Sequence, residues 1–202
     1  MKLYVSATSP FARKVLVLLR ETGQLGDVDL VMSAGTPLNP GNMPTGQNPL
    51  GKIPVLDPGT GPALFDSRVI CQFLDARAEG AFYPDPPRRW ATLTLEAMAD
   101  GMVDAAILMV YETRLRAEAQ VMQGWLDGQW AKVVRALDML EESWGDHLAG
   151  VPDMGHIALG CALSYLDFRH DDRAWRDGHP RLSAWEARFA ARASMKATAP
   201  VE

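Results

Sequence analysis

The fold of the first part of the chain is set by residues 2–19, KLYVSATSPFARKVLVLL. Lys2–Val5 has the short, largely apolar character of a β-strand. Ser9 and Pro10 then predict the start of a helix, because serine is a favoured N-cap and proline is tolerated at the first helical position. Apolar residues at helical spacing follow, and Gly23 predicts the end of this helix.

The remainder of the first part predicts three more strands and a second helix. Residues 33–51 are rich in Gly, Pro, Asn and Thr, so we expect mostly loop there, with at most one short helix. We expect strands at residues 29–32, 53–56 and 63–65, a tight turn at 57–61, and a helix opening at Asp66 and Ser67. The predicted order is β-α-β-(α)-β-β-α.

The second part of the chain predicts helices only. Residues 80–86 form the best candidate linker, and no strand-like alternation follows them. Apolar residues at three- and four-residue steps between Leu126 and Leu148 mark one long helix, and residues 154–166 are apolar nearly all round, as in a central buried helix. We therefore predict an α/β domain at residues 1–79, a linker at 80–86 and an all-helical domain at 87–202.

Composition excludes several classes of protein. The 202 residues carry a net charge of -5 and no long basic run, which argues against nucleic-acid binding. No apolar stretch approaches the roughly 18 residues that a membrane span requires. The two cysteines, Cys71 and Cys161, lie in apolar helical patterns and are interpreted as small buried hydrophobes rather than a disulfide framework. No signal segment is visible at the start, so we expect a cytoplasmic protein.

Three local features could each bind a ligand or could be purely structural. The start of a helix favours anions, and the Ser9 hydroxyl could donate a hydrogen bond to a thiolate there, or serve only as a cap. Pro54 could be an ordinary trans proline, or a cis proline that presents the backbone of Ile53 to a peptide ligand. Asp66 and Ser67 could only cap a helix, or could hold the ammonium and carboxylate of an amino-acid group.

Together these features resemble the glutathione transferase family. Ser9-Pro10-Phe11-Ala12 stands where glutaredoxins carry Cys-Pro-x-Cys. The combination of residues 48–56, NPLGKIPVL, with Phe65-Asp66-Ser67 is highly specific for the resemblance to this family. The resemblance covers almost the whole chain. It implies an N-terminal thioredoxin-like domain, an all-helical C-terminal domain, glutathione as co-substrate and a homodimer.

The resemblance also implies roles for individual residues. Ser9 would lie beside the glutathione sulfur as the catalytic residue, with Phe11 near it. Ile53, next to Pro54, would pair its backbone with the cysteinyl part. Asp66 and Ser67 would bind the γ-glutamyl end, where Asp66 replaces a commoner Glu. Two further residues are assigned less specifically: Lys52 would approach the glycine carboxylate or lie in solvent, and Asp104, one turn from Asp100, would reach glutathione across a dimer or be merely solvated.

The implied activity is a glutathione transferase, in which the glutathione thiolate attacks an unidentified apolar electrophile. A helix is expected at about residues 89–116, and some of its methionines and Tyr111 could line the pocket for this electrophile. A non-catalytic ligand-binding or regulatory protein, and a glutathione-dependent isomerase or peroxidase, remain alternatives. Thiol-disulfide exchange is disfavoured, because position 9 is serine rather than cysteine.

The start of the central helix departs from the family pattern. Relatives usually place Ser or Thr first and Asp fourth in a capping box, but this chain has Asp153 and His156 there. We expect Asp153 to cap, the reciprocal contact to be weakened, and His156 to be neutral and structural. The four histidines have no close ligand spacing, so no metal site is predicted; they are His147, His156, His170 and His179.

Overall fold

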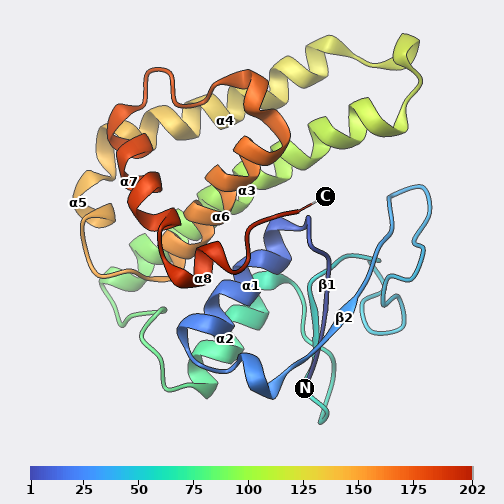
Figure 1. The fold of residues 1–202 in the computed structure, drawn as a ribbon, viewed down its shortest axis with the longest axis vertical. Helices are drawn as coiled ribbons and strands as arrows, with labels where there is room; N and C mark the ends of the chain where they lie inside the picture. The colour runs from blue at the N-terminus through green and yellow to red at the C-terminus, as the bar shows by residue number, and fades with distance from the viewer. Residues whose placement is uncertain (202) are drawn as a thin grey trace. The chain divides into compact units, whose positions relative to one another are not determined.

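A computed structural model describes residues 1–201 of the chain. It divides into two compact units, residues 1–85 with the segment from Ala193 onward, and residues 86–192. Figure 1 shows the helices and strands of both. Within residues 1–201, no helix is both long and apolar enough to cross a membrane.

The first unit is built on a three-stranded mixed sheet with the strand order β2-β1-β3. β1 lies in the centre, parallel to β2 and antiparallel to β3, so that Leu3 is opposite both Leu30 and Leu56. Helices α1 and α2 lie together on one side of the strands (Figure 1). The strands and helices of this unit are β1 (Lys2–Val5), α1 (Pro10–Glu21), η1 (Leu25–Asp27), β2 (Asp29–Met32), β3 (Val55–Asp57), α2 (Ser67–Arg77) and α8 (Ala193–Lys196).

Two predicted strands are shorter than expected. The strand predicted at residues 53–56 begins at Val55, because Pro54 has no N–H to donate to a neighbour. The strand predicted at residues 63–65 is reduced to one bridge, in which Leu64 exchanges two backbone hydrogen bonds with Leu56 (3.0 and 2.8 Å). Chain length explains this, since only Phe65 separates Leu64 from the cap of α2.

The second unit is entirely helical, as predicted. Its helices are α3 (Arg88–Leu115), η2 (Glu118–Gln120), α4 (Gln123–Ser143), α5 (Gly145–Leu148), α6 (Met154–His170), η3 (Asp171–Arg173) and α7 (Pro180–Ala190). The prediction that residues 154–166 form a central buried helix is confirmed, because nearly all of them are buried in α6. A side chain at Gly155 would place its Cβ 2.9 Å from the Cβ of Leu95, so glycine permits the close approach of α6 to α3.

The end of the chain differs from the predicted helical domain of residues 87–202. The change between the units falls at Asp85 and Pro86, inside the segment predicted as a linker, but α8 packs on α1 and groups with the first unit. Buried Arg13 of α1 donates from Nη2 to the carbonyl of Met195 (3.0 Å). This long-range contact could not be inferred from the local pattern of the terminal residues.

Candidate functional site

Ser9 occupies the N-cap of α1, immediately after the loop that follows β1. Its Oγ accepts a hydrogen bond from the N–H of Ala12 (3.2 Å), and Pro10 takes the first helical position. Accepting this bond leaves the hydroxyl proton of Ser9 available for another acceptor. Both Ser9 and Phe11 are half-buried, so the helix start combines a hydroxyl donor with the positive end of the helix dipole at an accessible position.

Asn48 fixes the loop that leads to Ile53 and Pro54. This buried side chain accepts from the N–H of Leu50 (3.1 Å) and donates to the carbonyl of Lys52 (2.9 Å). Gly51 has a φ of +61°, which glycine adopts without steric cost. The sequence marks Asn48 only as part of a motif; its structural role follows from these two side-chain hydrogen bonds.

The Ile53–Pro54 peptide is cis, the form considered in the sequence analysis. Ile53 is half-buried and Pro54 is buried, whereas Lys52 is exposed. Among residues 1–201, the backbone hydrogen bonds of loops and turns do not use the N–H or the C=O of Ile53. These two groups are available to pair with an extended ligand.

Asp66 is the N-cap of α2 and Ser67 is its first residue. The Asp66 carboxylate accepts from the backbone N–H of Arg68 (3.0 Å) and pairs with the Arg68 guanidinium (3.1 Å). Burial acts to raise the pKa of Asp66, but the hydrogen bonds and the charge of Arg68 outweigh it, so this pKa lies below its usual value. Asp66 is therefore an exposed carboxylate, and Ser67 beside it is buried.

Sheet topology brings Ser9, Ile53–Pro54 and Asp66–Ser67 to the same end of the sheet. β1 ends at Val5 just before α1, and antiparallel β3 begins at that end because Tyr4 pairs with Val55. The antiparallel bridge between Leu56 and Leu64 directs the chain back toward the start of β3, where Asp66 follows. Three segments widely separated in the sequence therefore converge around the C-terminal end of β1.

Lys14 is a charged residue of α1 that sequence reasoning missed. It is only 1 % exposed, and its charge helps to lower the pKa of Asp66, although burial and Arg68 act more strongly. The signal in the sequence was a lysine within the apolar face of α1. Lys14 thus adds a buried positive charge beneath the part of the first unit where the candidate residues gather.

Asp104 lies in the other unit. It is exposed on α3, whereas Asp100, one turn earlier, is buried. Its predicted approach to glutathione stays a prediction.

The start of α6 corrects the expectation of a weakened capping box. Asp153 Oδ1 accepts from the N–H of His156 (3.3 Å), and His156 Nδ1 accepts from the N–H of Asp153 (3.2 Å). His156 Nδ1 also lies 2.8 Å from Asp153 Oδ1. Without a proton, this nitrogen accepts from the cap N–H as the carboxylate of the usual box does; with a proton, it donates to the Asp153 carboxylate. His156 is 1 % exposed and stacks on His147, with ring centroids 5.1 Å apart.

The sequence spacing also gave no sign that two histidines meet one carboxylate. His147, Asp153 and His156 each place a possible metal-ligand atom within 4.8 Å of the others. Asp153 Oδ2 is already hydrogen-bonded by Thr92 (2.8 Å) and paired with the Arg88 guanidinium (3.2 Å). A cation here would have to displace Arg88, so the cluster is best understood as the polar network that caps α6.

The charge of Asp153 is strongly stabilised by this network. Burial acts to raise its pKa, but hydrogen bonds from His156 and Thr92 and nearby positive charge outweigh that effect and lower the pKa to about 2. For His147 burial dominates, and its pKa is lowered.

Comparison with known proteins places the chain in a family. Residues 8–77 match the glutathione S-transferase N-terminal domain and residues 123–188 match the C-terminal domain. The uncharacterized GST-like protein YibF of Escherichia coli is 34% identical over 99% of this chain and 98% of that protein.

Two crystal structures of a glutathione transferase family member from Pseudomonas fluorescens Pf-5 are 46% identical to this chain and cover all of it. One, with bound glutathione, has a TM-score of 0.97 and is covered over 99% of its chain. The other, with bound S-(propanoic acid)-glutathione, has a TM-score of 0.93 and is covered completely. The two domain matches and the full-length relatives show that this chain belongs to the glutathione S-transferase family.

Proposed function

We propose that the first unit binds glutathione and promotes ionisation of its thiol for attack on an electrophile. The observation that carries this proposal is the position of Ser9, whose hydroxyl caps α1 through its lone pair while its proton is available to a thiolate. A helix start and a hydroxyl donor both favour the anion over the neutral thiol. Each unit by which the thiol pKa falls corresponds to about 1.4 kcal/mol of preference for the thiolate.

The segments Ile53–Pro54 and Asp66–Ser67 would supply groups that match the peptide part of glutathione. The N–H and C=O of Ile53 would pair with the cysteinyl residue, and the Asp66 carboxylate would accept the γ-glutamyl ammonium with Ser67 at the adjoining carboxylate. Phe11 and Lys52 would lie toward the sulfur and the glycine carboxylate. The glutathione and S-(propanoic acid)-glutathione bound by the Pseudomonas fluorescens relative support the proposal.

The reacting sulfur belongs to the ligand in this proposal. Position 9 is serine, and among residues 1–201 both cysteines are buried and form no disulfide. With 1-chloro-2,4-dinitrobenzene as a reagent, the thiolate sulfur would form a bond to the ring carbon, the carbon–chlorine bond would break, and chloride would leave. The thiol proton would pass to solvent before the attack.

Substitution of Ser9 provides the test. Ser9→Ala should lower kcat/KM with this reagent by about 10²-fold or more, the scale seen when one preorganised donor to a developing anion is removed. Glutathione affinity, measured by calorimetry, should change by only a few-fold. Thr94→Ala is a matched control, because Thr94 is an exposed hydroxyl residue of the other unit whose Oγ1 donates to the helix carbonyl of Trp90 (2.7 Å).

The possible outcomes separate the proposed roles. Full conjugation activity in Ser9→Ala would show that Ser9 has no role in activating the thiol. Glutathione binding by the unmodified protein without turnover of the reagent, or of other aryl halides and enones, would favour a ligand-binding protein. Turnover of a peroxide or an isomerisable substrate alone would favour the other glutathione-dependent reactions.

A further inference from the structure

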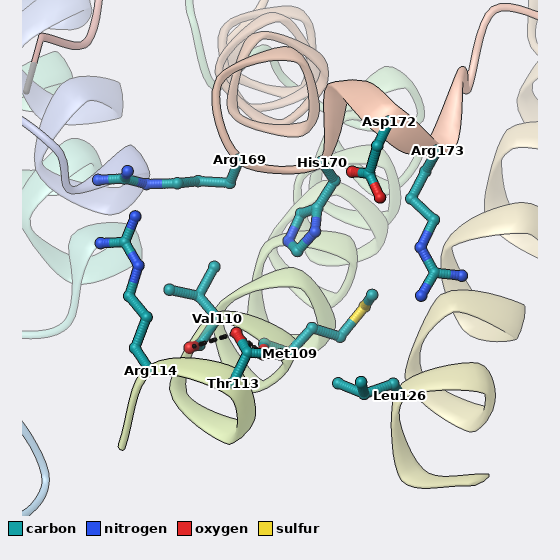
Figure 2. A pocket seen from close by; sticks show the side chains of 9 residues that line it. All are labelled: Met109, Val110, Thr113, Arg114, Leu126, Arg169, His170, Asp172 and Arg173. Atoms are coloured by element: carbon teal, nitrogen blue, oxygen red, sulfur yellow. Dashed lines mark hydrogen bonds between the residues drawn. The ribbon is translucent and has the colours of Figure 1, made fainter. Parts of the chain in front are cut away.

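A cavity of about 220 Å³ opens within the helical unit, between the C-terminal part of α3, the start of α4 and the end of α6 with η3. Figure 2 shows the side chains around it. It is smaller than the roughly 300–1,000 Å³ typical of pockets for drug-sized ligands, so it suits a small molecule or one substituent of a larger one. Its lining residues are Met109, Val110, Thr113, Arg114, Leu126, Arg169, His170, Asp172 and Arg173.

Positive charge dominates the lining of this cavity. Three arginines, Arg114, Arg169 and Arg173, face one aspartate, Asp172, although the whole chain has a net charge of -5. Among residues 1–201, no ion pair involves Arg114 or Arg173. An excess of permanently charged guanidinium groups favours an anionic ligand.

His170 also lines the cavity and is expected to be uncharged there. Its Nε2–H donates to the carbonyl of Ala106 (3.0 Å), so in the neutral ring Nδ1 carries a lone pair and no proton. Burial lowers the pKa of His170, which favours this neutral form. The positive charge of the lining therefore comes from the arginines.

Two of the three arginines that line the cavity, Arg114 and Arg169, lie on the same side of it. In Figure 2 the side chains of Arg114 and Arg169 extend toward one side of the view, whereas Arg173 lies on the other side near Leu126. Arg169 hydrogen-bonds Tyr165, and the charges of both Arg114 and Arg169 act on the Tyr165 hydroxyl. Planar guanidinium groups bind carboxylates through paired N–H donors, so Arg114 and Arg169 can share one carboxylate.

The rest of the lining is apolar enough to hold a carbon skeleton. Met109 is 3 % exposed and Leu126 is 7 % exposed, and Val110 lies beside them in the lining. Methionine adapts its shape to irregular groups. Inorganic phosphate would leave this surface in contact with water, whereas an organic acid would cover it.

We propose that this cavity binds a small organic carboxylate, with the acid group between Arg114 and Arg169 and the apolar group against Met109 and Leu126.

Binding is tested without glutathione, so that its result is independent of catalysis. Calorimetric titration with 3-phenylpropanoate should give at least tenfold tighter binding than with the uncharged 3-phenylpropanamide, and added salt should weaken only the acid. Arg114→Gln should weaken the acid at least tenfold and leave the amide unchanged, while Arg114→Lys should have a smaller effect. Arg135→Gln is the matched control, because Arg135 is an exposed arginine of α4 that does not line the cavity.

The place of binding is tested by the methyl NMR signal of Met109, assigned with Met109→Leu. We expect the acid to shift this signal in the unmodified protein and not in Arg114→Gln. Equal affinity for acid and amide, an Arg114→Gln variant that binds the acid normally, or an unmoved Met109 signal would each overturn the proposal. Phosphate that displaces the acid at equal concentration would also overturn it, because the apolar surface would then contribute nothing.

Discussion

The first-turn N–H groups of α1 and of α6 both need acceptors, and the N-caps of the two helices supply them in different ways. At α1, Ser9 is half-buried and accepts one backbone N–H, which leaves its own proton unused by that cap. At α6, Asp153 is 1 % exposed, and both carboxylate oxygens are engaged by neighbouring donors. A cap that is partly accessible can serve a ligand, whereas a cap whose acceptors are all occupied serves stability.

Electrostatics make the contrast sharper. The carboxylate of Asp153 is stabilised by hydrogen bonds from His156 and Thr92 and by nearby positive charge, which together lower its pKa to about 2 although burial acts to raise it. Arg88 also pairs with it (3.2 Å). Ser9 carries no charge, so the positive end of the α1 dipole is not neutralised by its own cap. The anion that would complete the α1 start has to come from outside the chain.

The largest expected effect is the loss of Asp153. Asp153→Ala should lower the free energy of unfolding by about 3–5 kcal/mol, because it leaves buried partners without their acceptor. Urea unfolding followed by circular dichroism measures this change. A loss below 1 kcal/mol would remove the distinction between the two caps, and Asp153→Asn, which preserves size, provides a milder variant if the alanine variant does not fold.

Acidification should expose the same difference. The folded pKa of Asp153 is about 2, below its unfolded value of 3.8, so its contribution is present above pH 4 and is lost as the pH falls toward 2. The stability difference between the unmodified protein and Asp153→Asn should therefore shrink by about 2 kcal/mol between pH 5 and pH 2. Unfolding titrations at four or five pH values would show this, and a constant difference would contradict the assigned charge network.

The α1 cap should matter much less for stability. Ser9→Ala should cost about 1 kcal/mol, and Ser9→Gly only a few tenths, because glycine is itself tolerated at the N-cap. Both variants lack the hydroxyl, so both should show the same loss of conjugation rate. If activity followed the stability of the variants instead, Ser9 would have to be regarded as a cap alone.

The smallest expected change in stability is at the start of α2. Asn is as good an N-cap as Asp, so Asp66→Asn should alter the unfolding free energy by less than about 0.5 kcal/mol. It removes the charge proposed to hold the γ-glutamyl ammonium, and glutathione should bind about fivefold more weakly, as expected for one exposed ionic contact worth about 1 kcal/mol. Calorimetry measures the affinity; an unchanged value would remove Asp66 from the proposed site.

Sequence reasoning succeeded where a feature is decided by residues close together in the chain. Ser9-Pro10 and Asp66-Ser67 start helices where predicted, because a cap and its first-turn N–H groups are local partners. The long apolar pattern of α6 likewise predicted a central helix, since a helix without a polar face has to be covered on all sides. The 63–65 strand failed because its length depends on a partner strand and on the helix that follows.

The sequence by itself therefore determined most of the order of elements and the caps of α1 and α2, and it predicted which residues could meet a thiol peptide. Only the tertiary structure decided that His147 and His156 meet at Asp153, that Lys14 acts on Asp66, and that Arg114 and Arg169 line one cavity. These partners are separated along the chain by distances that no local pattern encodes. Burial then gives their charges an importance that the same residues would not have in water.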